Sequence, residues 1–115
     1  VHVVPHSGPF ARGIHVTVQA KTRAPLTEME LLEVYQKAYA DKPFVQVING
    51  TPRIKNVVAS NQCHIGVATD GDTVVVMAAI DNLVKGAAGG AVQWMNRLWD
   101  LPETTGIDMP SPGWT

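Results

Sequence analysis

The sequence predicts an α+β domain in which helices cover one face of a mostly antiparallel sheet. Several segments alternate apolar and polar residues with period two, as half-buried strands do. Two other segments repeat apolar residues at helical spacing, and the elements follow the order strand, helix, strand, strand, strand, helix. Because the chain has 115 residues, we expect residues 1–115 to form one domain around a single core.

The first strand and the first helix have the clearest local signals. Residues 14–20 alternate apolar and polar side chains, which predicts a strand with one buried face. Thr27 and Glu30 are spaced as in a capping box, so a helix should begin at about Glu28 and stop before Pro43. Its apolar stripe is expected to contain Leu31, Leu32, Val34, Tyr35, Ala38 and Tyr39.

Three further strands are expected in the middle of the chain. Residues 44–48 form a short apolar run, and residues 62–68 alternate again. The turn sequence Asp70-Gly71-Asp72 should join this second strand to residues 73–80 in a hairpin. Residues 73–80 are apolar on both faces, which predicts a position inside the sheet.

The last helix is expected to begin at Asn82 and to end at Leu101-Pro102, before an irregular arm over residues 107–115. The residues expected on its apolar side are Val84, Ala88, Val92 or Ala91, Met95 and Trp99. Three glycines, Gly86, Gly89 and Gly90, lie near its start, although each interior glycine costs roughly 1 kcal/mol relative to alanine. Either tight packing or a ligand close to the backbone would explain them.

The composition excludes some classes of function. The chain has 45% hydrophobic residues, 17% charged residues, a net charge of -1 and no run of like charges. Nucleic acid and anionic membranes are therefore disfavoured as its main partners. The longest apolar run, residues 74–80, is too short to cross a bilayer. A single cysteine allows no intrachain disulfide. No leader sequence opens the chain, which fits the cytoplasm but leaves an organelle open.

The chain is expected to be a fragment of a longer polypeptide. It begins at Val1 rather than at an initiator methionine, and residues 1–4 have the apolar character of a strand interior. We therefore expect these first residues to continue a strand from an upstream segment.

The densest group of polar residues lies in PHSGPFARGI, residues 5–14. His6 offers an imidazole and Arg12 a planar guanidinium for a carboxylate or phosphate, although a rigid surface turn would have the same composition. The four histidines lack metal-ligand spacing, so no metal site is expected. Cys63 lies in an alternating strand and is expected to be a small core residue rather than a nucleophile. The tryptophans Trp94, Trp99 and Trp114 are expected to pack or to form subunit contacts.

Several motifs together resemble one enzyme family. IDNLVKGAAGGAVQWMN at residues 80–96 and LPETTGI at residues 101–107 resemble the C-terminal end of the N-acetyl-gamma-glutamyl-phosphate reductases. PHSGPFARGI, FVQVINGTPRIKNV and ASNQCHIGV resemble further segments of that family, in the same order. The resemblance therefore covers essentially the whole chain.

The resemblance implies a two-domain enzyme related to the glyceraldehyde-3-phosphate and aspartate-semialdehyde dehydrogenases. A Rossmann domain would bind NADP(H), and a glyceraldehyde-3-phosphate dehydrogenase-like C-terminal domain would supply substrate contacts and the interface of a homodimer or homotetramer. The family reduces N-acetylglutamyl phosphate, a small acyl phosphate, to its semialdehyde in arginine biosynthesis.

The resemblance also implies roles for individual residues. Asn82 would lie against the nicotinamide carboxamide, while Gly86 and Gly89 would let the last helix pack beside the cofactor domain. Lys85 would be a second anion contact or a partner of Asp81. By position, His6 and Arg12 would contact the carboxylate or phosphate of the substrate.

The departures from the family pattern define what the chain lacks. The family's Gly-Cys-Tyr and His-Arg-His motifs, which supply the catalytic cysteine and histidine, are absent, as is a glycine-rich dinucleotide fingerprint. Gly90 stands where glutamine is common in the family. We therefore expect the catalytic residues and the NADP-binding Rossmann domain to lie upstream, and this chain to be inactive alone.

Two other classes of function stay open from the sequence. One is a sister reductase acting on carrier-bound aminoadipyl phosphate or on aspartyl phosphate, because similar glycine-rich ends occur there. The other is a non-catalytic dimerising or binding module that kept the sheet and lost the chemistry. The motif at residues 5–14 favours the acetylglutamyl family.

Overall fold

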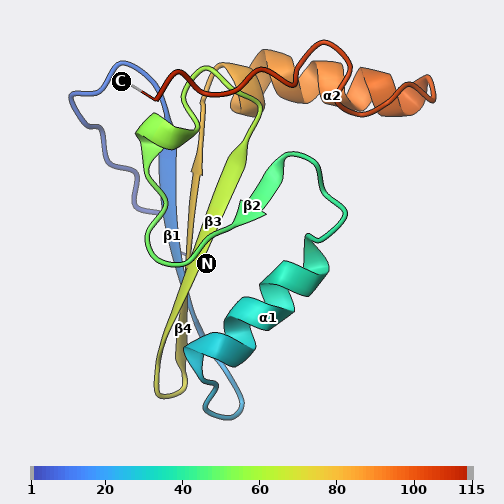
Figure 1. Cartoon of the computed structure of the whole chain (residues 1–115). Helices are drawn as coiled ribbons and strands as arrows, with labels where there is room; N and C mark the ends of the chain where they lie inside the picture. Colours follow the sequence, from blue (N-terminus) through green and yellow to red (C-terminus); the bar gives the residue numbers. More distant parts are fainter. Residues whose placement is uncertain (1, 114–115) are drawn as a thin grey trace.

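The computed structural model describes residues 2–113, which form a four-stranded mixed sheet and two α-helices (Figure 1). The sheet order is β1-β4-β3-β2, with β1 and β3 antiparallel to β4 and with β2 parallel to β3. The expected α+β class is therefore confirmed. The elements are β1 Ile14–Lys21, α1 Glu28–Ala38, β2 Val45–Val47, η1 Ile54–Asn56, β3 Cys63–Asp70, β4 Thr73–Ile80, η2 Val84–Ala88 and α2 Gly89–Leu98.

The hairpin between β3 and β4 organises the sheet. Gly71 has a positive φ of 58° in the turn, a conformation that glycine adopts without strain. β4 then lies between β1 and β3, and Ala79 near its end is completely buried. The prediction that this apolar strand lies inside the sheet is confirmed.

Helix α1 covers β2 and β3 and forms the core with them. The predicted capping box is present, because Thr27 Oγ1 accepts from the Glu30 amide at 3.3 Å and the Thr27 amide donates to Glu30 Oε2 at 2.8 Å. Leu31 of α1 packs with Ile65 and Val67 of β3 in the main hydrophobic cluster. Val34 and Ala38 are exposed, so their predicted places in the buried stripe are wrong.

Strand β1 does not have the buried face that its alternation predicts. The register pairs Val16 with Ala78 and Val18 with Val76, which puts the apolar side of β1 on the same sheet face as α1. All eight residues of β1 are nevertheless exposed, and Val18 is 53% accessible. The reason is that α1 lies over β2 and β3 rather than over this edge strand (Figure 1).

The last helix lies across the end of the sheet instead of on the face that α1 covers (Figure 1). It begins with a π-helical turn, in which the Gly86 amide bonds to Asp81 O at 2.9 Å and the Ala88 amide to Leu83 O at 3.0 Å. The extra residue in this turn rotates the helix that follows by about 100°. This displaces the predicted stripe, so that Trp99 is 68% exposed.

The same change of phase decides which residues of α2 are buried. Met95 of the predicted stripe is exposed, whereas Gly89 and Asn96 are buried. Trp94 is also exposed, which leaves both tryptophans of this helix available for contacts with another segment or subunit. Trp114, for which we expected the same role, lies outside the described residues.

The two ends of the described chain lack regular structure. Residues 2–13 form neither helix nor strand, so the strand predicted over residues 1–4 is wrong for residues 2–4, while Val1 lies outside the description. Residues 107–113 form the irregular arm that the sequence predicts, and Ile107 is buried at its start. None of the helices in residues 2–113 is long and apolar enough to cross a membrane.

Candidate functional site

Asp81 lies directly after β4, and its hydrogen bonds connect three segments of the chain. We call this set of contacts the joint. The Asp81 side chain is 0% exposed, and its Oδ1 accepts from Arg12 Nη2 at 2.9 Å and from the amides of Leu83 and Val84 at 2.8 and 2.7 Å. Its Oδ2 accepts from the Ala59 amide at 2.7 Å. Burial raises the pKa of this carboxyl, but the four hydrogen bonds outweigh burial and lower the pKa below its usual value.

Asn82 makes the neighbouring connection. Its Oδ1 accepts from the Gly13 amide at 2.7 Å. Gly13 has a φ of +116°, and a Cβ there would lie 2.3 Å from Ile54 Cγ2, so both the backbone conformation and the space require glycine. Because the amide oxygen of Asn82 is occupied, its NH₂ group is the part that can donate to a ligand.

The structure therefore brings together Arg12 and Asn82, two of the residues that the sequence marks, although 70 positions separate them. Arg12 is bonded to Asp81, the residue that precedes Asn82. Its side chain is 31% exposed, and its buried Nε has no hydrogen-bond partner among residues 2–113. The expected alternative in which Lys85 pairs with Asp81 is wrong. Arg12 forms the ion pair with Asp81, and Lys85 donates to Gln93 instead.

His6 lies beside this joint, on the wall of a cavity of about 500 Å³. The full lining consists of His6, Ser7, Gly8, Phe10, Gly13, Ile14, His15 and Ile54. Gly13 belongs both to this wall and to the contact with Asn82, so the cavity adjoins the joint. His15 is a second imidazole on this wall. The alternation of residues 14–20 predicts only that it points to the opposite face from Ile14, so the sequence did not single it out for this cavity.

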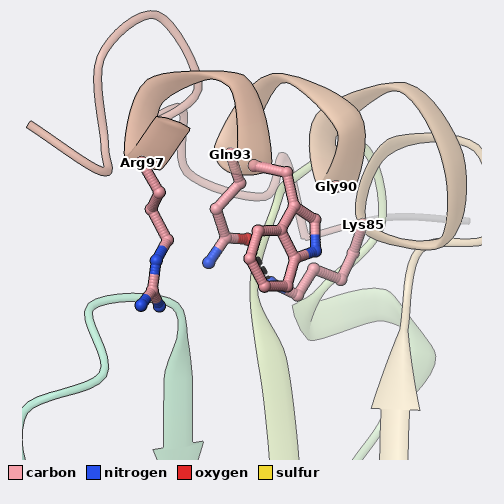
Figure 2. A pocket seen from close by; sticks show the side chains of 5 residues that line it. Lys85, Gly90, Gln93 and Arg97 are labelled. Atoms are coloured by element: carbon pink, nitrogen blue, oxygen red, sulfur yellow. Dashed lines mark hydrogen bonds between the residues drawn. The ribbon is translucent and has the colours of Figure 1, made fainter. Parts of the chain in front are cut away.

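Lys85 belongs to a separate polar network with Gln93. Lys85 Nζ donates to Gln93 Oε1 at 2.5 Å (Figure 2). Asn61 Nδ2 donates to the same oxygen at 3.0 Å. Gln93 Nε2 in turn donates to Glu103 Oε1. Burial lowers the pKa of Lys85, and the proximity of Cys63 and Glu103 partly offsets this. The sequence pointed to Lys85 but gave no sign of Gln93 or Glu103.

A small cavity of about 220 Å³ lies beside this network, lined by Lys85, Gly90, Gln93, Trp94 and Arg97 (Figure 2). Lys85 Nζ also lies 5.3 Å from the centre of the Phe44 ring, within the range of a cation–π contact. The ammonium is thus already held by an amide oxygen and an aromatic face of its own chain.

The glycines of the last helix have close neighbours within the chain. A Cβ at Gly89 would lie 2.6 Å from Asn61 Oδ1 and 2.7 Å from Val84 Cγ1. A Cβ at Gly90 would lie 2.8 Å from Lys85 O. Tight internal packing therefore accounts for both. Gly86 is exposed, with a 3.3 Å approach to Asp81 O, so its proposed contact with a cofactor domain stays a prediction.

Two other titratable side chains are shaped by burial. Burial lowers the pKa of His64, which lies on the sheet face opposite α1, and its Nδ1 has no hydrogen-bond partner within residues 2–113. Burial raises the pKa of the Cys63 thiol, and Lys85 only partly offsets this. In the described part of the chain, no three His, Cys, Asp or Glu side chains lie close enough to hold a metal ion.

We expect Cys63 to be a poor nucleophile. Its raised pKa and partial burial leave little accessible thiolate, so at about pH 7 iodoacetamide should modify it about tenfold more slowly than a free cysteine. Intact-mass measurements over time would give the rate, with the urea-unfolded protein as the fast-reacting control. Alkylation at the unfolded rate in the folded protein would contradict the assignment of Cys63 to the core.

Comparisons with known proteins place the chain in a family. The family described as "Semialdehyde dehydrogenase, dimerisation domain" matches residues 1–82. An N-acetyl-gamma-glutamyl-phosphate reductase from Pelotomaculum thermopropionicum is 50% identical over 114 residues, which cover 96% of this chain and 33% of that protein. Reductases of the same name from Brevibacillus brevis and Methanosarcina acetivorans are 44% and 43% identical over 95% and 96% of this chain, and 33% and 34% of theirs.

Solved structures show the same fold. Aspartate semialdehyde dehydrogenase II from Vibrio cholerae superposes with a TM-score of 0.63 over 77% of this chain and 28% of that chain, at 22% identity. A second structure of that enzyme, complexed with ASA, gives a TM-score of 0.60 at 23% identity over 77% of this chain and 27% of that chain. The chain spans about a third of the length of the curated relatives that it matches. By the match over residues 1–82, the chain belongs to the semialdehyde dehydrogenase dimerisation-domain family.

Proposed function

We propose that this chain is part of an NADP-dependent reductase that converts N-acetylglutamyl phosphate to N-acetylglutamate semialdehyde and phosphate in arginine biosynthesis. The observation that carries the proposal is the 50% identity to a reductase of that name over 96% of the chain. The joint at Asp81 supports it, because a guanidinium and a free carboxamide NH₂ suit an anionic substrate bound next to a cofactor.

Arg12 and His6 are the proposed substrate contacts. The Arg12 guanidinium gives one donor to Asp81, and its remaining N–H groups can bind the carboxylate or phosphate of the acyl phosphate. His6 lines the adjoining cavity, where an imidazole can donate to the same anion. The cavity of about 500 Å³ has room for a small ligand of this kind.

Asn82 is the proposed contact for NADP, with Gly86 and Lys85 nearby. The fit depends on the amide orientation, because Gly13 occupies Oδ1 and leaves the NH₂ group as a donor for the carboxamide oxygen of a nicotinamide. The nicotinamide would supply the hydride for the reduction. Gly86 is exposed beside Asp81 and can allow close approach, whereas Lys85 would first have to leave Gln93 to contact an anion.

Asn82 can be tested with two substitutions that separate its two hydrogen-bonding groups. Asn82→Asp keeps the acceptor for Gly13 but loses the NH₂ donor, so we expect the KM for NADPH to rise about tenfold at nearly unchanged stability. Asn82→Ala loses both groups, and we expect the same kinetic effect together with about 1 kcal/mol lower stability. Steady-state kinetics and thermal unfolding of the complete coding product would measure both.

The surface residue Asn49 offers a matched control, because Asn49→Asp makes the same chemical change in an exposed turn. It should leave the KM for NADPH at the wild-type value. Wild-type kinetics for both Asn82 variants would remove this residue from the cofactor site.

The catalytic residues of the proposed enzyme lie upstream of this chain. In the proposed reaction, an upstream cysteine thiolate attacks the acyl phosphate and phosphate leaves, forming a thioester. Hydride addition to the thioester carbon, followed by cleavage of the carbon–sulfur bond, would release the semialdehyde and regenerate the thiolate. Cys63 does not fit the role of that cysteine, because burial raises its pKa and its partly buried side chain packs against the core. We therefore propose that this chain alone is inactive.

We further propose that the complete protein is a homodimer or homotetramer in the cytoplasm, or in an organelle if it is eukaryotic. The family description names a dimerisation domain, which supports self-association. The exposed apolar residues Ile14, Val16 and Val18 on β1 supply a surface that another segment or subunit can cover.

The choice of acyl phosphate can be tested with a substrate panel. In the reverse, phosphate-dependent direction, N-acetylglutamate semialdehyde should be oxidised with a kcat/KM at least about a hundredfold above that of aspartate semialdehyde. The identity to acetylglutamyl reductases, 50% against 22% for the aspartate enzyme, is the reason for this expectation. A preference for aspartate semialdehyde, or for the carrier-bound aminoadipate semialdehyde, would replace the proposed substrate.

A further inference from the structure

We infer that Asp81 is a positioning residue that fixes the orientation of the Arg12 guanidinium toward the substrate anion, an inference that rests on the proposed function of Arg12. Residues 2–13 form neither helix nor strand, so no regular element holds the Arg12 backbone. A long side chain on such a segment would populate several rotamers. The 2.9 Å bond to Asp81 selects one of them.

Asp81 can fix Arg12 because Asp81 is itself immobilised. Backbone amides from two different segments hold its carboxylate: Leu83 and Val84 after the strand, and Ala59 in the loop after η1. Its side chain is completely buried, and these three amides hold both of its carboxylate oxygens. Arg12 is thus bonded to a fixed point of the backbone framework rather than to a mobile surface carboxylate.

The guanidinium has donors left for a ligand. Of its five N–H groups, one on Nη2 donates to Asp81, and the buried Nε has no partner among residues 2–113. The side chain is 31% exposed, so its accessible N–H groups, rather than the buried Nε, are the donors that an anion can reach. By occupying one edge of the fork, Asp81 leaves the other N–H groups for a carboxylate or a phosphate.

A second bond beside the first reinforces the placement. Asp81 and Asn82 are adjacent after β4, and they bond to Arg12 and Gly13, which are adjacent before β1. These two parallel links, at 2.9 and 2.7 Å, prevent the loop from turning about either bond alone. Asp81→Asn keeps one acceptor oxygen but loses the charge, so it should loosen the guanidinium while the Asn82–Gly13 link helps to keep the loop in place.

The test uses four variants of the complete coding product in the phosphate-dependent assay with N-acetylglutamate semialdehyde. Arg12→Lys and Asp81→Asn should each raise the KM for the semialdehyde or for phosphate about tenfold, and the KM that changes identifies the anion that Arg12 binds. The KM for NADPH or NADP should stay within about twofold. In the double variant, Asp81→Asn should add little to the effect of Arg12→Lys, because both changes disable one contact.

Ser60→Ala is the matched control for structural damage. Ser60 follows Ala59 in the loop after η1 that is bonded to Asp81. Ser60 is buried, its hydroxyl donates to Val57 O at 2.7 Å and accepts from the Gln62 amide at 3.3 Å, and it has no hydrogen bond to Arg12. This variant should lower the melting temperature without changing either KM. If Asp81→Asn moves the KM no further than Ser60→Ala does, the positioning role is wrong.

A measurement without turnover separates this inference from the proposed function. Rotation of the Arg12 guanidinium, followed by ¹⁵N NMR of labelled arginine, should be slow in the wild type and in Ser60→Ala and fast in Asp81→Asn. Fast rotation in the wild type would overturn the inference. If the protein shows no reductase activity but rotation is slow, the proposed function fails while Asp81 still orients Arg12. If activity is present and Arg12→Lys leaves every KM unchanged, Arg12 is not a substrate contact and has nothing to position.

Discussion

Replacing Gly66 with alanine should destabilise the protein by about 3 kcal/mol. Gly66 lies in β3, on the sheet face opposite α1, where the loop after β2 crosses it. A Cβ at this position would lie 2.0 Å from Gly50 O and 3.0 Å from Pro52 Cδ. The nearest atom belongs to the backbone, and the loop is attached to the same strand through the bond from the Ile48 amide to Ile65 O at 2.8 Å. The loop cannot retreat without breaking this contact.

The measurement is chemical unfolding of the complete coding product, and Gly86→Ala is the control. At Gly86 the nearest atom to an added Cβ is Asp81 O at 3.3 Å, an approach that a shift of a few tenths of an ångström relieves. That variant should change the free energy of unfolding by less than about 1 kcal/mol. Equal stability of the two alanine variants would show that the loop over Gly66 is free to move.

Removing the Asp81 carboxylate should have the largest effect on stability at neutral pH, about 3–5 kcal/mol for Asp81→Ala. The substitution leaves Arg12 without its partner and leaves the amides of Leu83, Val84 and Ala59 without an acceptor. The pH dependence has a definite sign, because the folded pKa of this carboxyl lies below its usual value. The stabilisation is present above that value and is lost as pH falls through the lower, folded pKa.

Denaturant unfolding of the wild type and Asp81→Ala near neutral pH and in acid would measure this difference. The gap between the two proteins should shrink as the pH falls from the usual carboxyl pKa through the lower, folded pKa. The control is Asp72→Ala, which removes the exposed Lys21–Asp72 pair of 2.5 Å on the hairpin and should change stability by less than about 1 kcal/mol. A similarly small change for Asp81→Ala would mean that the joint does not hold these segments together.

Local signals in the sequence predicted the elements well. The capping box at Thr27, the turn at Gly71 and the two-sided apolar strand β4 depend on neighbouring residues, and each lies where the sequence placed it. The motif resemblance agrees with the family match over residues 1–82 and, for the C-terminal motifs, with the reductases that match 95–96% of this chain.

The burial predictions that were wrong depended on contacts between distant segments or on the hydrogen-bond register of a helix. The alternation in β1 correctly predicted a strand but not its burial, because the position of α1 over β2 and β3 is a tertiary choice. In the last helix, helical spacing placed Met95 and Trp99 on the buried side, but the π-helical turn changed the phase of every residue after it. No side-chain pattern revealed that turn.

The contacts within the candidate site also could not be predicted from the sequence. Residue chemistry marked Arg12 and Asn82, but only the fold shows that Asp81 bonds to the first and that Gly13 bonds to the second. The glycines were recognised as unusual from their helical cost, yet the atoms that require them, Asn61 Oδ1 near Gly89 and Lys85 O near Gly90, come from packing within the chain.

The most direct test of the account is a coupled assay of the complete coding product beside this 115-residue chain. The assay follows phosphate-dependent NADP reduction with N-acetylglutamate semialdehyde. We predict activity from the complete protein and none from the chain alone, as expected for the part of a reductase that contributes substrate and subunit contacts. No activity from the complete protein, while the folded chain still self-associates, would contradict the proposed reductase and favour another semialdehyde or a dimerising module.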